Sequence, residues 1–109
     1  MGYEYKEILK LDEMLNEAGI PHTITKYLGG HLIRYFGHNP IPKNGANGFV
    51  RGVTCTVVQT DFSHGHTRDL IEFTGLMSEE EIKECGDDFM GDQTAEAVFE
   101  RIKQHYFNA

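Results

Sequence analysis

Residues 22–36 read HTITKYLGGHLIRYF, which is two runs of strand-forming residues separated by Leu28, Gly29 and Gly30. Threonine, isoleucine, tyrosine and phenylalanine favour β-strands, and two glycines in a short connection are typical of a hairpin. The stretch therefore predicts two antiparallel strands. Because a sheet must bury one face, the flanking sequence has to supply further strands and the helices that cover them.

A helix is expected on the N-terminal side of this hairpin. Apolar residues recur at helical spacing over residues 3–18, and acidic residues fill most of the positions between them. Gly19 and Pro21 then end the helix, because glycine tolerates a left-handed cap and proline cannot continue the helix.

Two further strands are expected after the hairpin. Residues 37–48, GHNPIPKNGANG, are rich in glycine, proline and asparagine and predict a loop. FVRGVTCTVVQT, residues 49–60, and RDLIEFTG, residues 68–75, are rich in β-branched and aromatic residues, which is typical of strands.

Two helices are expected after the fourth strand. Ser78 and Glu81 are spaced as a capping box, which starts a short helix that Gly86 ends. Thr94 is the expected N-cap of the last helix, whose buried face is predicted to contain Val98, Phe99, Ile102 and Tyr106. The predicted fold is α+β, in a single domain over residues 1–109. It has an antiparallel sheet of about four strands, with the N-terminal and C-terminal helices packed on one face.

Composition places the chain in a broad class. Of its 109 residues, 39% are hydrophobic and 25% are charged, which is typical of a globular domain. No apolar stretch approaches the roughly 20 residues that span a bilayer, and the N-terminus lacks the apolar run of a signal peptide. We therefore expect a cytoplasmic protein without a membrane partner, in which Cys55 and Cys85 are reduced thiols.

The charge is unevenly distributed along the sequence. The net charge is −7, yet residues 18–60 contain no acid, whereas residues 78–100 contain nine acids and one base. Overall negative charge argues against tight nucleic-acid binding, and a localised acidic segment favours a partner with a basic surface. A solvated acidic face remains the alternative, since acids in a first helical turn are common. The predicted partner-binding residues are Glu79, Glu80, Glu81, Glu84, Asp87, Asp88 and Asp92.

A second candidate site is the segment TDFSHGHTRD, residues 60–69. His64 and His66, flanked by Asp61 and Asp69, have the chemistry of metal ligands. Gly65 between them favours a bend, however, and no spacing in the chain matches a known zinc pattern. We interpret the segment as a polar hairpin turn and predict no cofactor. A small metal- or ligand-binding protein that uses the His64/His66 turn is the alternative function.

The sequence contains no convincing catalytic group. Ser63 and His64 are adjacent, so on a strand they would point to opposite faces, and Cys55 lies within an apolar strand. Asp87 and Asp88 are neighbours in a charged loop. We therefore predict that the chain is not an enzyme. A weak nucleic-acid-binding face remains a third possibility, formed by aromatic and basic residues of the acid-free stretch: Tyr27, His31, Arg34, Tyr35, Lys43 and Arg51.

Four stretches follow one another in a characteristic order: LDEMLNEAGIP, CTVVQTDFSHG, DLIEFTGLMSEEE and TAEAVFERI. In this order they resemble a group of small, uncharacterised proteins encoded by phages and prophages of Gram-positive bacteria. The resemblance implies a phage-encoded binding protein, and anti-CRISPR proteins and other inhibitors of bacterial immunity are the prominent class of this kind. It also implies a host or defence-system partner, such as a CRISPR effector nuclease, whose Lys- and Arg-lined channel an acidic surface can occupy.

Overall fold

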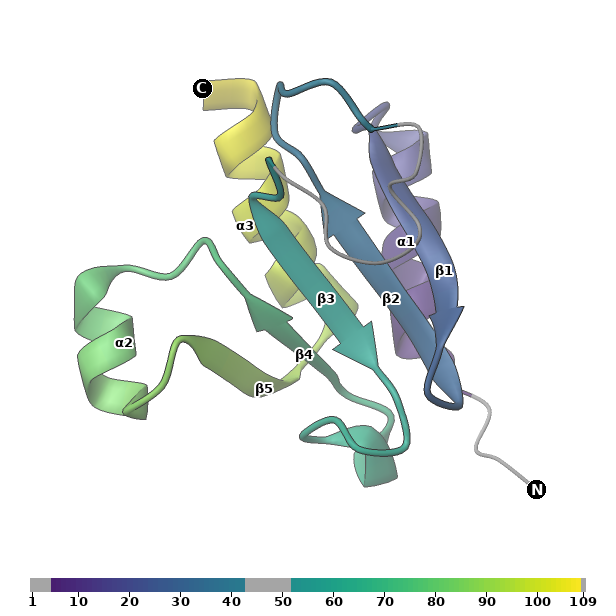
Figure 1. Ribbon diagram of the computed structural model, residues 1–109, viewed down its shortest axis with the longest axis vertical. Coiled ribbons are helices and arrows are strands. Elements are labelled where there is room, and N and C mark those ends of the chain that lie inside the picture. Colours follow the sequence, from purple (N-terminus) through teal and green to yellow (C-terminus); the bar gives the residue numbers. More distant parts are fainter. Residues whose placement is uncertain (1–4, 43–51, 109) are drawn as a thin grey trace.

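The computed structural model describes residues 5–42 and 52–108, which form an antiparallel sheet with helices on one of its faces (Figure 1). The sheet has five strands in the order β1-β2-β3-β4-β5, so that strands adjacent in sequence are adjacent in space. The elements are α1 (Glu7–Glu17), β1 (His22–Tyr27), β2 (Gly30–Tyr35), β3 (Cys55–Gln59), the 3-10 helix η1 (His66–Arg68), β4 (Ile71–Thr74), α2 (Glu79–Cys85), β5 (Phe89–Gln93) and α3 (Ala95–Asn108).

The predicted α+β class is confirmed, but the expected number of strands was too low. The missing strand is β5, which lies between α2 and α3 and pairs with β4. Its sequence, FMGDQ, contains Gly91 and Asp92, both of types depleted in strands. Asp92 has a φ of 56°, and the pairing is irregular between Ile71 and Phe73. A short, bulged strand of this composition gives no alternating pattern that sequence analysis can detect.

Several predicted boundaries also differ. The fourth strand, predicted over residues 68–75, is β4 over Ile71–Thr74, because Arg68 belongs to η1. The third strand begins at Cys55, so Gly52, Val53 and Thr54 precede it; the predicted start over residues 49–51 lies outside the described residues. The first helix begins at Glu7, and residues 3 and 4 of its predicted range, 3–18, lie outside the described part as well. Residues 43–48 of the predicted 37–48 loop are not described either.

The first hairpin forms as the sequence predicts. Its two-residue turn, Leu28 and Gly29, has φ values of 43° and 82°, which is the type I′ geometry that matches the twist of antiparallel strands. Gly30 follows the turn beside β3, where a Cβ atom would lie 1.8 Å from the carbonyl oxygen of Gln59. Glycine at position 30 is therefore needed for the hairpin to approach β3.

The core lies between the sheet and the two long helices. Figure 1 shows α1 and α3 side by side behind the sheet, and α2 projecting beyond β4 and β5. Of the predicted face of α3, Val98 and Ile102 are fully buried, whereas Phe99 and Tyr106 are partly buried at the margin. The buried residues between the sheet and the helices include Ile8, Leu11, Leu15, Ile33, Tyr35, Val57, Ile71, Phe73, Ala95, Val98 and Ile102.

A polar cluster fixes the N-terminus of α1 to the sheet. The side chain of Gln59 is fully buried, and its Oε1 accepts a hydrogen bond from the Ile8 backbone N–H at 2.9 Å. Its Nε2 donates to Asp69 Oδ1 at 2.7 Å. The same Asp69 oxygen accepts from the backbone N–H groups of Lys6 (2.9 Å) and Glu7 (3.2 Å). Asp69 thus caps a helix that lies 62 residues earlier in the chain, satisfying N–H groups that a helix leaves unpaired.

The N-terminus of α3 is held in turn by α1. Glu7 Oε2 accepts a hydrogen bond from the Ala95 backbone N–H at 2.6 Å, and Lys10 forms an ion pair with Glu96 at 2.5 Å. The Lys10–Glu96 pair raises the pKa of the lysine and lowers that of the glutamate, but it is exposed and contributes little to stability. The carboxylate of Glu7 provides the more specific contact between the two helices.

Replacing Asp69 by alanine should destabilise the protein by about 2 kcal/mol or more, because a helix cap is lost and buried Gln59 loses a partner. Asp69→Asn is the matched control: asparagine keeps an acceptor oxygen and tolerates the φ of 53° at this position. Urea unfolding followed by circular dichroism measures both variants. A change within about 0.5 kcal/mol for Asp69→Ala, as at an ordinary surface position, would contradict the proposed cap.

Candidate interaction surface

The α2 segment, residues 78–88, lies on an excursion between β4 and β5 (Figure 1). None of the residues of α2 is buried, and the apolar side chain of Ile82 is 39% exposed. A seven-residue helix of this kind is too short to be stable by itself. Its order therefore depends on its caps and on contacts made by its first turn.

Local hydrogen bonds define both ends of α2. Ser78 Oγ accepts from the Glu81 backbone N–H at 3.1 Å, and Glu81 Oε1 accepts from the Ser78 backbone N–H at 3.0 Å, which completes the predicted capping box. At the other end Gly86 has a φ of 74°, and its N–H donates to the Ile82 carbonyl at 2.9 Å. The predicted start and end of this helix are thus confirmed.

Arg101 ties the segment to the rest of the protein. Its Nη1 donates to Glu81 Oε1 at 2.9 Å, and its Nη2 contacts Glu81 Oε2, so the pair is bidentate. The same guanidinium donates to the Leu76 carbonyl at 3.0 Å and lies 4.9 Å from the centre of the Phe73 ring. The hydrogen bonds from Arg101, together with that from the Ser78 backbone, lower the pKa of Glu81 to about 2.

The seven predicted partner-binding acids therefore divide into two groups. Glu81 completes the capping box and forms an ion pair with Arg101. Asp92 lies on β5 and forms an ion pair with Arg68 at 2.6 Å. The other five are exposed, and the salt bridges found among the described residues involve none of them. These five, which we call the α2 carboxylates, are Glu79, Glu80, Glu84, Asp87 and Asp88.

The His64/His66 segment forms a turn that packs on β5. His66 Nδ1 donates to the Ser63 carbonyl at 2.6 Å, whereas the His64 ring packs against the Phe89 ring, with centroids 5.2 Å apart. Gly65 has a φ of 90°, and a Cβ atom there would lie 2.7 Å from Asp92 Oδ1. Residues 66–68 then form η1, so the connection is longer and more ordered than the simple hairpin turn that the sequence predicts.

Other groups weighed as ligands or catalysts have structural partners. Asp61 Oδ1 accepts from the Tyr5 hydroxyl at 2.6 Å, and Asp69 belongs to the α1 cap. Ser63 Oγ donates to the Thr60 carbonyl at 3.1 Å and accepts from the Thr60 N–H at 3.0 Å. Burial raises the pKa of the Cys55 thiol to about 12. No group of three or more His, Cys, Asp or Glu side chains able to hold a metal ion is found among the described residues.

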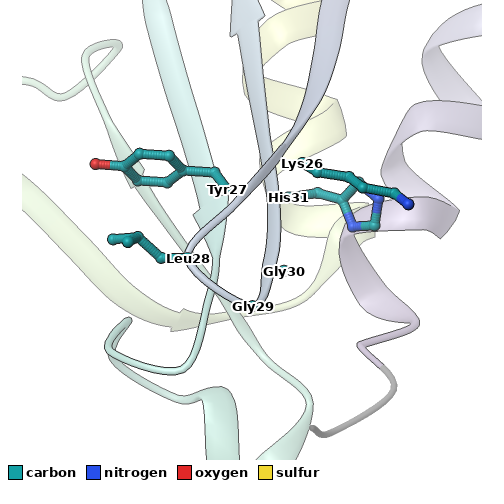
Figure 2. Close-up of a pocket in the computed structure, with 6 residues that line it drawn as sticks. All are labelled: Lys26, Tyr27, Leu28, Gly29, Gly30 and His31. Carbon is teal, nitrogen blue, oxygen red and sulfur yellow. The ribbon is translucent and has the colours of Figure 1, made fainter.

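The aromatic and basic residues of the acid-free stretch do not share one face. Strand alternation places Tyr27 and Arg34 on the open face of the sheet and His31 on the helix side, as Figure 2 shows for Tyr27 and His31. Tyr35 is fully buried, and its hydroxyl lies 2.7 Å from His105 Nδ1. The predicted Lys43 and Arg51 lie outside the described residues. The predicted set is therefore divided between the two sides of the sheet.

The hollow at the tip of the first hairpin is open and is lined by residues 26–31 (Figure 2). Tyr27 and Leu28 point to one side of the hairpin, and Lys26 and His31 point to the other, toward α1. Because these side chains diverge, the hollow does not gather polar groups around one point, as a small-molecule site does. None of the described helices is both long and apolar enough to cross a membrane.

Comparisons with protein-family models, with curated proteins and with solved structures find no match to this chain.

The residue that positions the candidate surface, Arg101, is not apparent from the sequence. Arg101 lies 20 residues from Glu81, within a helix that is otherwise described by its apolar spacing. A single arginine beside buried Ile102 gives no signal that it pairs with the first turn of another helix. The capping box, by contrast, depends on residues three positions apart and is visible in the sequence.

The Glu81–Arg101 contact should make stability depend on pH. Because the pKa of Glu81 is lowered in the folded state, its contribution is fully present above about pH 4.5 and is lost as the pH falls toward about 2. Urea unfolding over this interval should show a smaller loss of stability in Glu81→Gln than in the parent. Glu84→Gln, at an exposed position of the same helix, should behave like the parent. An unchanged pH profile for Glu81→Gln would contradict this assignment.

Proposed function

We propose that this chain is a non-enzymatic binding protein whose α2 segment docks against a basic surface of another protein. The observation that carries the proposal is the exposure of the five α2 carboxylates on a segment, residues 78–88, none of whose residues is buried. Glu81 and Arg101 hold the segment in place, so the free carboxylates are presented in a defined arrangement.

The length of the excursion supports a binding role. β4 ends at Thr74 and β5 begins at Phe89, so residues 75–88 connect two antiparallel neighbours. A hairpin connection of two to five residues is enough to join such strands. Leu76 and Met77 pack against the core, but none of residues 78–88 is buried. Longer ordered connections on a stable scaffold commonly carry function.

The positions of the carboxylates argue against a purely local explanation. Glu79 and Glu80 lie in the first turn of α2, where the helix dipole favours acids. Glu84 lies in the last turn, and Asp87 and Asp88 follow the helix, where the dipole favours cations instead. These three acids are therefore not accounted for by the stability of the helix. A basic partner would account for them, because a cluster of exposed carboxylates is electrostatically complementary to its positive charges and speeds their association.

The partner that this arrangement fits best is a groove lined with Lys and Arg that normally holds nucleic acid. Carboxylates placed along such a groove compete with phosphates, and Ile82 provides an apolar contact among them. The resemblance to phage and prophage proteins makes a nuclease of a bacterial defence system, such as a CRISPR effector, the leading class of partner. The chain would then act as a counter-defence inhibitor in the cytoplasm of the bacterial host.

Reversing three α2 carboxylates should abolish such binding while the fold survives. We choose Glu84→Lys, Asp87→Lys and Asp88→Lys together, because these positions lie away from the capping box and from the first turn. Cleavage of target DNA by a guide-loaded CRISPR nuclease from a Gram-positive bacterium is the assay. The parent chain should inhibit cleavage less as salt increases, because screening shortens electrostatic reach to about 8 Å at physiological ionic strength. The triple variant should not inhibit at any salt concentration.

A matched variant separates position from net charge. Glu13→Lys, Glu17→Lys and Glu100→Lys together change the same number of exposed acids, on α1 and α3, and should leave inhibition close to that of the parent. Thermal unfolding checks that both variants remain folded. Equal inhibition by the parent and the α2 variant would contradict the proposed surface. Absence of inhibition by the parent across several such nucleases would contradict the proposed class of partner.

A further inference from the structure

The two edges of the sheet are protected to different degrees. β5 forms one edge, and its pairing with β4 is interrupted by an irregularity between Ile71 and Phe73. Asp92, with its positive φ, and the ion pair from Arg68 further disturb that edge. β1 forms the other edge, and its six residues pair with β2 in unbroken register. Regular, unbulged edges are templates for another strand, and proteins commonly disrupt the edges that must stay free.

The backbone groups that β1 leaves free can be identified from the hairpin. The two-residue turn closes at the pair Tyr27 and Gly30, which in a type I′ hairpin is a hydrogen-bonded pair. Bonded and non-bonded pairs alternate along an antiparallel ladder, so the N–H and C=O groups of His22, Ile24 and Lys26 point away from β2. None of the described strands pairs with this outer edge of β1.

We propose that the outer edge of β1 pairs with β1 of a second copy of this chain, forming a symmetric dimer with a continuous sheet of ten strands. The two-fold axis passes beside Ile24, so that each Ile24 lies opposite its equivalent in the second copy. His22 then lies opposite Lys26, and Thr23 lies opposite Thr25. In this register the three residues whose N–H and C=O groups point away from β2 lie opposite the same three residues of the second copy. The antiparallel ladder requires this arrangement, because only such residues can exchange hydrogen bonds.

Charge complementarity favours a second copy in this register. Lys26 projects to the α1 side of the sheet (Figure 2). The residue opposite it, His22, lies on the same side, with its Nε2 2.6 Å from Asp12 Oδ1 and its Nδ1 2.9 Å from the Ile20 carbonyl. The Asp12 side chain is 23% exposed, so the ammonium group of Lys26 reaches a carboxylate of the second copy. Lys26 is the one Lys or Arg of β1, so no lysine or arginine faces its own equivalent across the proposed ladder.

The open face of the same edge is also self-complementary. Tyr27 is 46% exposed, and Figure 2 shows its ring pointing away from α1. The proposed register places it opposite Pro21 of the second copy, which is exposed in the single chain. Thr23 and Thr25 form β-branched cross-strand pairs beside it, a combination that stabilises antiparallel ladders. Pairing therefore covers the exposed Tyr27 ring with Pro21 of the second copy. Pro21 has no backbone N–H, and the proposed ladder requires none from it, because it and Tyr27 form a non-bonded pair.

The proposed dimer does not depend on the proposed function. β1 and the α2 segment lie at opposite ends of the sheet, so pairing through β1 leaves both α2 segments accessible (Figure 1). Pairing of one strand per copy is a small interface, and we therefore expect reversible association that increases with protein concentration. Inhibition assays and measurements of molecular mass report on the two proposals separately.

Sedimentation equilibrium of the full chain over a wide concentration range tests the dimer. Lys26→Pro should shift the mass to that of a single chain, because proline removes an outward-facing N–H and its ring blocks the incoming strand. Lys26→Gln keeps the N–H group and should still dimerise, with a higher dissociation constant. A wild-type chain that stays monomeric up to millimolar concentration would overturn the proposal and leave this edge to an extended segment of another protein. A folded Lys26→Pro variant that dimerises as the wild type does would also overturn it.

A cross-linking experiment tests the register and does not rely on the proline variant folding. Thr23 and Thr25 form a non-bonded pair in the proposed ladder, with Cα atoms about 4.5 Å apart, within the range of disulfides. Thr23→Cys and Thr25→Cys are made separately in a Cys85→Ser background, because Cys85 is exposed. Oxidising their mixture should give several-fold more cross-linked dimer than oxidising either variant alone. Equal yields from the mixture and from the single variants would overturn the register.

Discussion

The hydrogen-bond cluster of Gln59 and Asp69 is the contact on which the arrangement of the helices depends. One carboxylate oxygen of Asp69 accepts from two N–H groups at the start of α1 and from the buried amide of Gln59. Gln59 in turn accepts from the next N–H of the helix, at Ile8. Three of the N–H groups that a helix leaves unpaired are thereby satisfied, one by Gln59 of β3 and two by Asp69 between η1 and β4, which fixes where α1 begins.

The position of α3 follows from that of α1. Once α1 is in place, Glu7 caps the first turn of α3 through the Ala95 N–H, and both helices bury their apolar faces against the same side of the sheet. Apolar burial supplies most of the free energy, but it is not directional. The caps are directional, because an unpaired buried polar group is costly, and they select one placement among those that would bury similar area.

Features that depend on near neighbours in sequence were predictable, and those that depend on distant ones were not. The hairpin around Gly29 and the capping box of Ser78 follow from residues a few positions apart, and both are present. Asp69 was interpreted as a possible metal ligand because its true partners lie 62 and 63 residues away. β5 was missed because its glycine and aspartate conceal a strand that is specified by pairing with β4. Of the seven predicted partner-binding acids, the sequence could not indicate that Glu81 and Asp92 have ion-pair partners.

We conclude that a helix–sheet body held by the Gln59–Asp69 cluster carries an α2 segment that is positioned by its own caps, by Arg101 and by contacts with β5. Native-state hydrogen exchange tests this claim most directly, because it measures the free energy of opening at each amide. The amides of Ile8 and Ala95 should exchange only through global unfolding, whereas those of Ile82 and Gly86 should exchange through a local opening of lower free energy. Exchange of Ile8 at or below the free energy found for Gly86 would contradict the account.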